Sequence, residues 1–249
     1  MADKKKTRKK SKKKTRKEDD EKEDVKKLEK IKHVEDRQLL WIVFFIFLII
    51  GGFIGTWYYV QTLNKFEYLG LKWNVEEREG GNFDFYHTRF PVFYNANANY
   101  NLYLREDPRE NNVSVNLIED SYGIRFRPDI VISLSPKAMR CENSHIANAK
   151  MSQFLVQAVG LNSEGASTNK TYANELNASY ATCNKYNNMN DTEINKTIII
   201  IDSQSQNPEI RQNQDNENCY IIDVGKCENM KATERFMIAV LEQALGRQE

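Results

Sequence analysis

The apolar residues of the chain are concentrated in one uninterrupted stretch, Leu39–Val60, which contains 22 residues and no charge. At 1.5 Å per residue, an α-helix of this length spans about 33 Å. This length matches a hydrocarbon core of roughly 30 Å, so the stretch predicts a single transmembrane helix. Trp41 at one end and the run Trp57–Tyr59 at the other are typical of aromatic residues at membrane–water interfaces.

Between residues 61 and 128 the pattern changes to period-two alternation, which marks strands with one buried face. Tyr100, Leu102 and Leu104 alternate with other side chains, and so do Phe85 and His87. Clusters of Gly and Asn separate these runs, as turns require. The region therefore predicts a small antiparallel sheet whose buried face includes these alternating residues.

From residue 129 onward, short β-branched runs are followed by helical patterns. The runs resemble strands of a sheet that is covered on both faces: 130–134, 197–201 and 220–224. Apolar residues at helical spacing predict helices over 144–159 and 231–245. The Asn-rich stretch 162–195 has a weak pattern and is expected to be loop with one short element.

These patterns predict a mixed fold, α+β or α/β, in four parts. Residues 1–38 are expected to form a cytoplasmic basic tail, disordered to helical. Residues 39–60 form the transmembrane helix, 61–128 an external β-rich region, and 129–249 an external α/β domain with two helices stapled by disulfides.

The net charge of +1 hides a strong asymmetry. Residues 1–38 carry 17 basic and 10 acidic residues, whereas the part after the apolar stretch carries 19 basic and 25 acidic residues. Lys and Arg favour the cytoplasmic side of a membrane, so we expect the N-terminus inside the cell and residues 61–249 outside. A cleaved signal peptide is the alternative, but its apolar core would be shorter and followed by small residues.

All four cysteines lie in the part that is expected to be external: Cys141, Cys183, Cys219 and Cys227. An even number in an oxidising compartment favours two disulfides. Cys141 and Cys227 each lie between a predicted strand and the next helix, whereas Cys183 and Cys219 precede strands. In a parallel sheet this placement favours Cys141–Cys227 with Cys183–Cys219. The pair Cys219–Cys227 requires a hairpin within 223–226, because a straight strand would hold the two residues about 20 Å apart.

The same part contains five N-x-Ser/Thr acceptor sites for glycosylation: Asn112, Asn169, Asn177, Asn190 and Asn195. Such triplets also arise by chance in an Asn-rich sequence, so their modification is a weaker expectation than the disulfides.

The sequence contains no recognisable catalytic or cofactor motif, so no catalytic residue, metal ligand or cofactor is expected. Cys141 and His145 have a spacing that could place two metal ligands on one helix face. A disulfide cysteine beside a solvated histidine is the simpler interpretation.

The most unusual polar segment is Arg105–Arg109, which ends a strand at Pro108. Two interpretations stay open. Arg105 and Arg109 could form a clamp for a carboxylate or phosphate, or they could pair with Asp107 and Glu106 in a salt-bridged corner.

The Lys-rich tail indicates that the partners include the lipid bilayer, with anionic headgroups attracting the basic residues. Nucleic acid is a weaker candidate, because no aromatic residue interrupts the tail to stack bases.

Several segments are distinctive: FEYLGLKW at Phe66–Trp73, NLYLREDPR at Asn101–Arg109, and the cysteine-containing runs RCENSHIANA, YATCN and NCYIIDVGKC. In these segments the chain resembles an uncharacterised family of single-pass membrane proteins from small-genome archaea. The resemblance implies the membrane topology and no activity.

The function expected from the sequence is a membrane-anchored extracytoplasmic structural or protein-interaction domain with an unidentified protein partner. The alternative is an external ligand-binding domain or enzyme. Its site would lie at the carboxyl edge of the parallel strands, near Asp202, Ser203 and Gly225, where open α/β sheets bind ligands.

Overall fold

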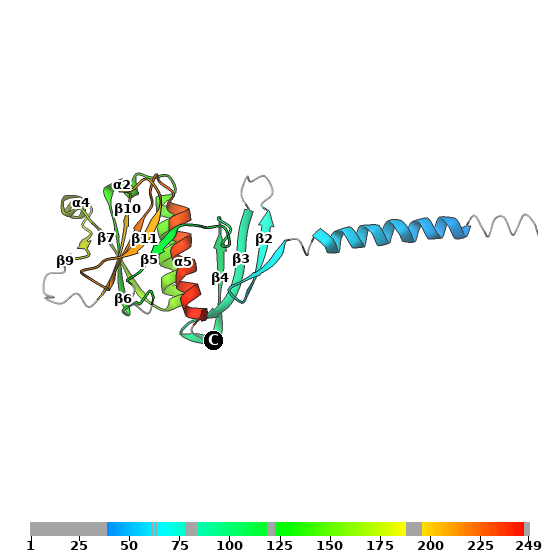
Figure 1. Ribbon diagram of the computed structural model, residues 1–249, viewed down its shortest axis with the longest axis horizontal. Coiled ribbons are helices and arrows are strands. Elements are labelled where there is room, and N and C mark those ends of the chain that lie inside the picture. Colours follow the sequence, from blue (N-terminus) through cyan, green and yellow to red (C-terminus); the bar gives the residue numbers. More distant parts are fainter. Residues whose placement is uncertain are drawn as a thin grey trace, which may run out of the picture. The chain divides into compact units, whose positions relative to one another are not determined.

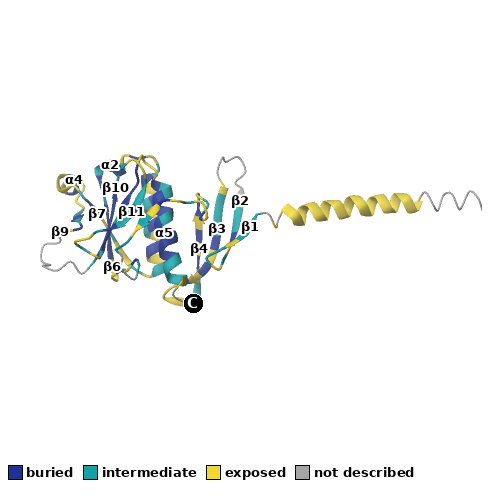
Figure 2. Cartoon of the chain, viewed as in Figure 1, coloured by how far each residue is buried: buried dark blue, intermediate teal, exposed yellow. Residues whose placement is uncertain are grey.

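A computed structural model describes residues 39–60, 62, 64–77, 84–118, 123–187 and 196–246 (Figure 1). The chain divides into two compact units, Met1–Leu63 and Asn64–Glu249, and we call the latter the C-terminal unit. In the first unit, Leu39–Val60 is one helix, long and apolar enough to cross a membrane, and its side chains are exposed (Figure 2). The predicted tail, residues 1–38, lies outside the described residues.

The C-terminal unit begins with a four-stranded antiparallel sheet in the order β1-β2-β3-β4. Its strands are β1 (Lys65–Tyr68), β2 (Leu71–Glu77), β3 (Asp84–Val92) and β4 (Asn95–Leu104). Tyr100, Leu102 and Leu104 are buried, as the alternation predicts. The expectation for β3 is wrong by one residue, because Thr88 and Phe90 face the core and His87 lies on the opposite face.

An eight-stranded sheet follows, in the order β5-β11-β12-β10-β6-β7-β8-β9. Its centre is parallel, from β12 through β10 and β6 to β7, and contains the three predicted β-branched runs. The strands are β5 (Ser114–Asn116), β6 (Asp129–Leu134), β7 (Asn162–Ser167), β8 (Ser179–Thr182), β9 (Lys185–Asn187), β10 (Thr197–Asp202), β11 (Glu209–Gln212) and β12 (Cys219–Asp223). The stretch 162–195 was expected to be mostly loop, but its described residues, 162–187, form three short strands and a helix.

Two long helices lie between the sheets (Figure 1). The helices of the unit are α2 (Pro136–Met139), α3 (Ser144–Phe154), α4 (Lys170–Glu175) and α5 (Asn229–Gly246), and α3 continues as a π-helical turn, η1 (Leu155–Val159). One hydrophobic core includes side chains of all three layers: Trp73, Leu102, Phe154, Phe236, Ile199 and Tyr220. The expected division at residue 128 therefore does not separate two cores, because both sides of it pack on the same pair of helices.

A buried carboxylate connects the layers. Glu234 of α5 is fully buried, and its oxygens accept the backbone N–H groups of Arg105 and Glu106 just after β4, all at 2.9 Å. Lys150 of α3 donates to the same carboxylate at 2.9 Å. A buried charge is tolerated only when it is paired and hydrogen-bonded, and these contacts meet both conditions.

The π turn at the end of α3 holds the β3–β4 hairpin. The N–H of Phe93 donates to the carbonyl of Ala158 at 2.9 Å, outside the helical ladder. Gly160 ends the turn with φ +89°, and a Cβ there would lie 2.5 Å from the Tyr94 ring. Glycine is therefore required at this position both by its backbone conformation and by the close approach of the hairpin.

The two disulfides are Cys141–Cys227 and Cys183–Cys219, the pairing that the strand edges favour. Cys183 lies in the turn between β8 and β9, and β9 lies on the side of the eight-stranded sheet away from α5 (Figure 1). Cys183 packs with Ile198 and Ile200, while Ser133 Oγ donates to the carbonyl of Ala181 at 2.7 Å. The turn of the β8–β9 hairpin thus packs against this face of the sheet.

We expect Glu234→Ala to lower the free energy of unfolding by about 3–5 kcal/mol, because it leaves the half-buried ammonium of Lys150 and two backbone N–H groups without an acceptor. Denaturant titration of the full chain measures this loss. The control is Glu67→Ala, at an exposed position of β1, which should change stability by no more than about 0.5 kcal/mol. Equal effects of the two substitutions would show that the Glu234 contacts do not stabilise the fold.

We expect dilute reductant to cleave Cys141–Cys227 before Cys183–Cys219. Cys227 is exposed, whereas Cys183 and Cys219 are buried, and thiol–disulfide exchange requires access to sulfur. Alkylation followed by peptide mass spectrometry at successive times gives the order. The difference should disappear in denaturant, and earlier cleavage of Cys183–Cys219 in the native protein would contradict the expectation.

Candidate functional site

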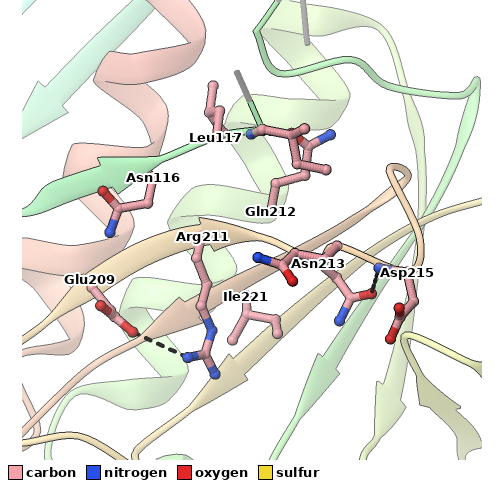
Figure 3. A pocket seen from close by; sticks show the side chains of 10 residues that line it. Asn116, Leu117, Glu209, Arg211, Gln212, Asn213, Asp215 and Ile221 are labelled. Atoms are coloured by element: carbon pink, nitrogen blue, oxygen red, sulfur yellow. Dashed lines mark hydrogen bonds and ion pairs between the residues drawn. The ribbon is translucent and has the colours of Figure 1, made fainter. Parts of the chain in front are cut away.

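A recess of about 560 Å³ lies at the β5–β11 side of the eight-stranded sheet (Figure 3). Its volume is within the range of ligand sites, roughly 300–1,000 Å³. Charged, amide and apolar side chains line it, among them Asn116, Leu117, Glu209, Arg211, Asp215 and Ile221.

Strand β11 forms one wall because its side chains alternate. Ile210 and Gln212 are buried, whereas Glu209 and Arg211 point to the other face. Gln212 connects the wall to its neighbours, since its amide oxygen accepts the N–H of Ile118 at 3.1 Å and its Nε2 donates to the carbonyl of Glu217 at 2.8 Å.

The two charged side chains of this wall pair loosely. Arg211 Nη1 lies 3.3 Å from Glu209 Oε1, and the two side chains are 41% and 30% exposed. Each therefore retains hydrogen-bonding capacity toward the recess. Figure 3 shows Arg211 between Glu209 and Ile221, so an ion pair and an apolar floor lie side by side.

The turn after β11 forms a second wall. The side-chain oxygen of Asn213 accepts the N–H groups of Asp215 and Asn216, both at 3.0 Å, which presents the exposed Asp215. Asn216 in turn donates to the carbonyl of Cys183 at 2.6 Å. The Cys183–Cys219 disulfide therefore supports this wall as well as the back of the sheet.

The recess lining combines paired charges with apolar side chains. Among the described residues, no group of three His, Cys, Asp or Glu side chains could hold a metal ion. The recess lining contains no histidine, cysteine or hydroxyl side chain to act as a nucleophile or its base. Paired charges next to apolar side chains can instead recognise a surface of mixed polarity.

The Arg105–Arg109 segment forms a corner and not an open clamp. Arg109 donates to Asp107 through Nε at 3.0 Å and Nη2 at 2.6 Å, and its guanidinium lies 3.8 Å from the centre of the Phe66 ring. Arg105 is held through its backbone N–H by Glu234. Burial raises the pKa of Asp107, but the hydrogen bonds and charge of Arg109 outweigh it and leave the pKa below its usual value.

The polar groups at the carboxyl edge of the parallel strands form hydrogen bonds with one another. The buried Asp223 carboxylate accepts the N–H groups of Gln204, Ser205 and Gly225 at 2.9–3.3 Å. Asp202 accepts the N–H of Ser203 at 2.8 Å, and Ser203 Oγ donates to the carbonyl of Gly225 at 2.8 Å. The groups expected to receive a ligand at this edge thus fix the loops around it, and Cys141–Cys227 joins two of those loops.

Three of the five glycosylation acceptors are exposed: Asn112, Asn169 and Asn177. Asn169 uses its side-chain oxygen to cap α4, accepting the N–H of Tyr172 at 3.0 Å. Asn190 and Asn195 lie outside the described residues. Cys141 is in a disulfide, which removes it as a metal ligand beside His145.

Sequence reasoning missed the recess. Glu209–Gln212 alternates like a strand and precedes an Asn-rich turn, a signal that could have identified β11. The same signal could not have identified β5 as the strand that pairs with β11, because β5 lies about 95 residues earlier in the chain and has only three residues.

Comparison with protein-family models, with curated proteins and with solved structures found no match for this chain. The resemblance to archaeal single-pass membrane proteins therefore stays a prediction, and the function must be argued from the geometry.

We expect Asp107→Asn to lower the free energy of unfolding at pH 7. In acid, the free energy of unfolding of this variant should fall less than that of the wild type. A depressed pKa in the folded state adds stability above the unfolded value of about 3.9, and this stability is lost as pH falls through the folded pKa. Denaturant midpoints at neutral pH and between pH 4 and 2 measure both effects. Asp84→Asn, at an exposed position of β3, is the control, and an unchanged acid profile for Asp107→Asn would contradict the role of the pair.

Proposed function

We propose that the protein is a single-pass membrane protein with its N-terminus in the cytoplasm and its C-terminal unit outside the cell. The apolar helix, the excess of basic residues before it and the two disulfides after it support this topology. The basic tail would add attraction to anionic headgroups.

The C-terminal unit, in this proposal, is a protein-interaction domain that contacts its partner at the recess beside β5 and β11. The observation that carries the proposal is that charged side chains meet an apolar floor in the recess. By contrast, the carboxylates of Asp107 and Asp223 already accept hydrogen bonds from groups within the unit.

An extended polypeptide segment fits this recess better than a compact small molecule. The recess lies on one face of the sheet, where Asn116, Arg211 and Ile221 form a row across β5, β11 and β12, so an extended segment could lie along this face. Side chains of such a segment alternate in direction, so some would contact Ile221 and Leu117 while others would reach Arg211 or Asp215.

Photo-crosslinking in intact cells tests this function. A photoreactive residue at Asn116 or Gln214, both exposed beside the recess, should capture a protein of defined mass. A protease added outside the cells should remove the adduct, as the topology requires. The same residue at Lys72, on the outer face of β2, is the matched control and should not capture that protein.

Arg211→Glu in the crosslinking variants should lower the adduct yield severalfold, because it places a second carboxylate beside Glu209. A lack of protein adducts from both recess positions, or equal capture from Lys72, would overturn the interaction proposal. An adduct that external protease cannot reach would overturn the topology alone.

A further inference from the structure

The three charged side chains that line the recess differ in how their charges are compensated. Glu209 and Arg211 pair at 3.3 Å, so their charges cancel. Asp215 is exposed, and its carboxylate forms no ion pair or hydrogen bond with the residues that the structure describes. The lining therefore has one uncompensated charge, and this charge is negative.

The backbone around Asp215 is fixed, although its side chain is exposed. Asn213 Oδ1 accepts the N–H groups of Asp215 and Asn216, both at 3.0 Å, and Asn216 donates to the carbonyl of Cys183 at 2.6 Å. The turn 213–218, NQDNEN, contains a second acid, Glu217, and no basic residue. A cationic group would therefore meet a carboxylate that is already in position, and no base of the turn would compete with it.

An apolar side chain lies within reach of this carboxylate. Arg211 pairs with Ile221 across the ladder of β11 and β12, and Asp215 follows Arg211 by four residues. At 3.3 Å per residue, the Cα atoms of Arg211 and Asp215 lie at most about 13 Å apart. Figure 3 shows Asp215 and Glu209 at opposite ends of the lining, with Arg211 and Ile221 between them. One short segment can therefore contact both Ile221 and Asp215.

We propose that the recess binds an extended polypeptide segment in which a Lys or Arg lies within four residues of an apolar residue. The apolar side chain packs on Ile221, and the basic side chain pairs with Asp215. This inference rests on the proposed function of the recess and names the chemistry of its partner.

An acidic segment fits the recess less well. A carboxylate brought to Arg211 would also approach Glu209, so repulsion would offset the attraction. A basic side chain at Asp215 meets no like charge in the turn. Arg211 stays paired with Glu209 in this arrangement, so Arg211→Glu disturbs the wall of the recess but leaves the charge that selects the partner.

Two peptides that differ only in charge test this preference, TLTLKKT and TLTLEET, both with blocked ends. Biolayer interferometry measures their binding to the full chain in nanodiscs of zwitterionic lipid, and empty nanodiscs give the background. The wild type should bind the Lys peptide about fivefold more tightly than the Glu peptide, because one peptide forms an exposed ion pair where the other is repelled. Asp215→Lys should reverse this preference, and Asp215→Asn should abolish it.

The matched control is Glu175→Lys, which makes the same kind of charge change at an exposed position of α4. This helix contacts β7 and β8, far from β11 in the strand order of the sheet. The control should keep the preference of the wild type. Misfolding cannot imitate the reversal in Asp215→Lys, because the Glu peptide must then bind more tightly than it binds the wild type.

Equal binding of the two peptides to the wild type, a preference for the Glu peptide, or a preference that Asp215→Lys leaves unchanged would each overturn the inference. A lack of binding by both peptides would also overturn it. None of these results removes the protein adducts expected from Asn116 and Gln214, so the inference can fail while the proposed function stands. A lack of those adducts overturns the proposed function itself.

Discussion

The C-terminal unit depends on the contact that Glu234 makes at the centre of its three layers. The carboxylate belongs to α5, binds the backbone where β4 ends, and pairs with Lys150 of α3. A charge buried in this way is tolerable only when every partner is in place. The contact therefore fixes the position of both helices relative to the four-stranded sheet, and the shared core follows from that position.

In the C-terminal unit, some polar groups stabilise the fold, whereas others remain available to bind a ligand. Asp107 and Asp223 occur in segments that look chemically active in the sequence, yet both are saturated by nearby donors. Arg211 and Asp215 attract no attention in the sequence but lie open at the recess. A buried polar group usually stabilises structure, whereas a loosely paired and exposed one can exchange its partner for a ligand.

Local patterns predicted the elements whose apolar residues recur with the period of a strand or a helix. The alternation of β4, the β-branched runs of β6, β10 and β12, and the two long helices were all visible in the sequence. The placement of α5 was not, because Glu234 and Arg235 suggest a solvated face although the helix is covered on both sides. The strands within 162–195 were missed because their polar residues are held in place by Cys183 and by pairing rather than by propensity. The recess depends on β5 and β11, which are distant in sequence, so no local pattern predicts it.

The central place of α5 has a consequence for biosynthesis. Translation proceeds from the N-terminus, so this helix leaves the ribosome after every other described element. Until it arrives, the inner face of the four-stranded sheet, with Trp73, Phe90 and Leu102, lacks part of its cover. Nascent intermediates with exposed apolar surface are prone to aggregate. A chaperone that holds this incomplete unit during synthesis would therefore act on its first sheet.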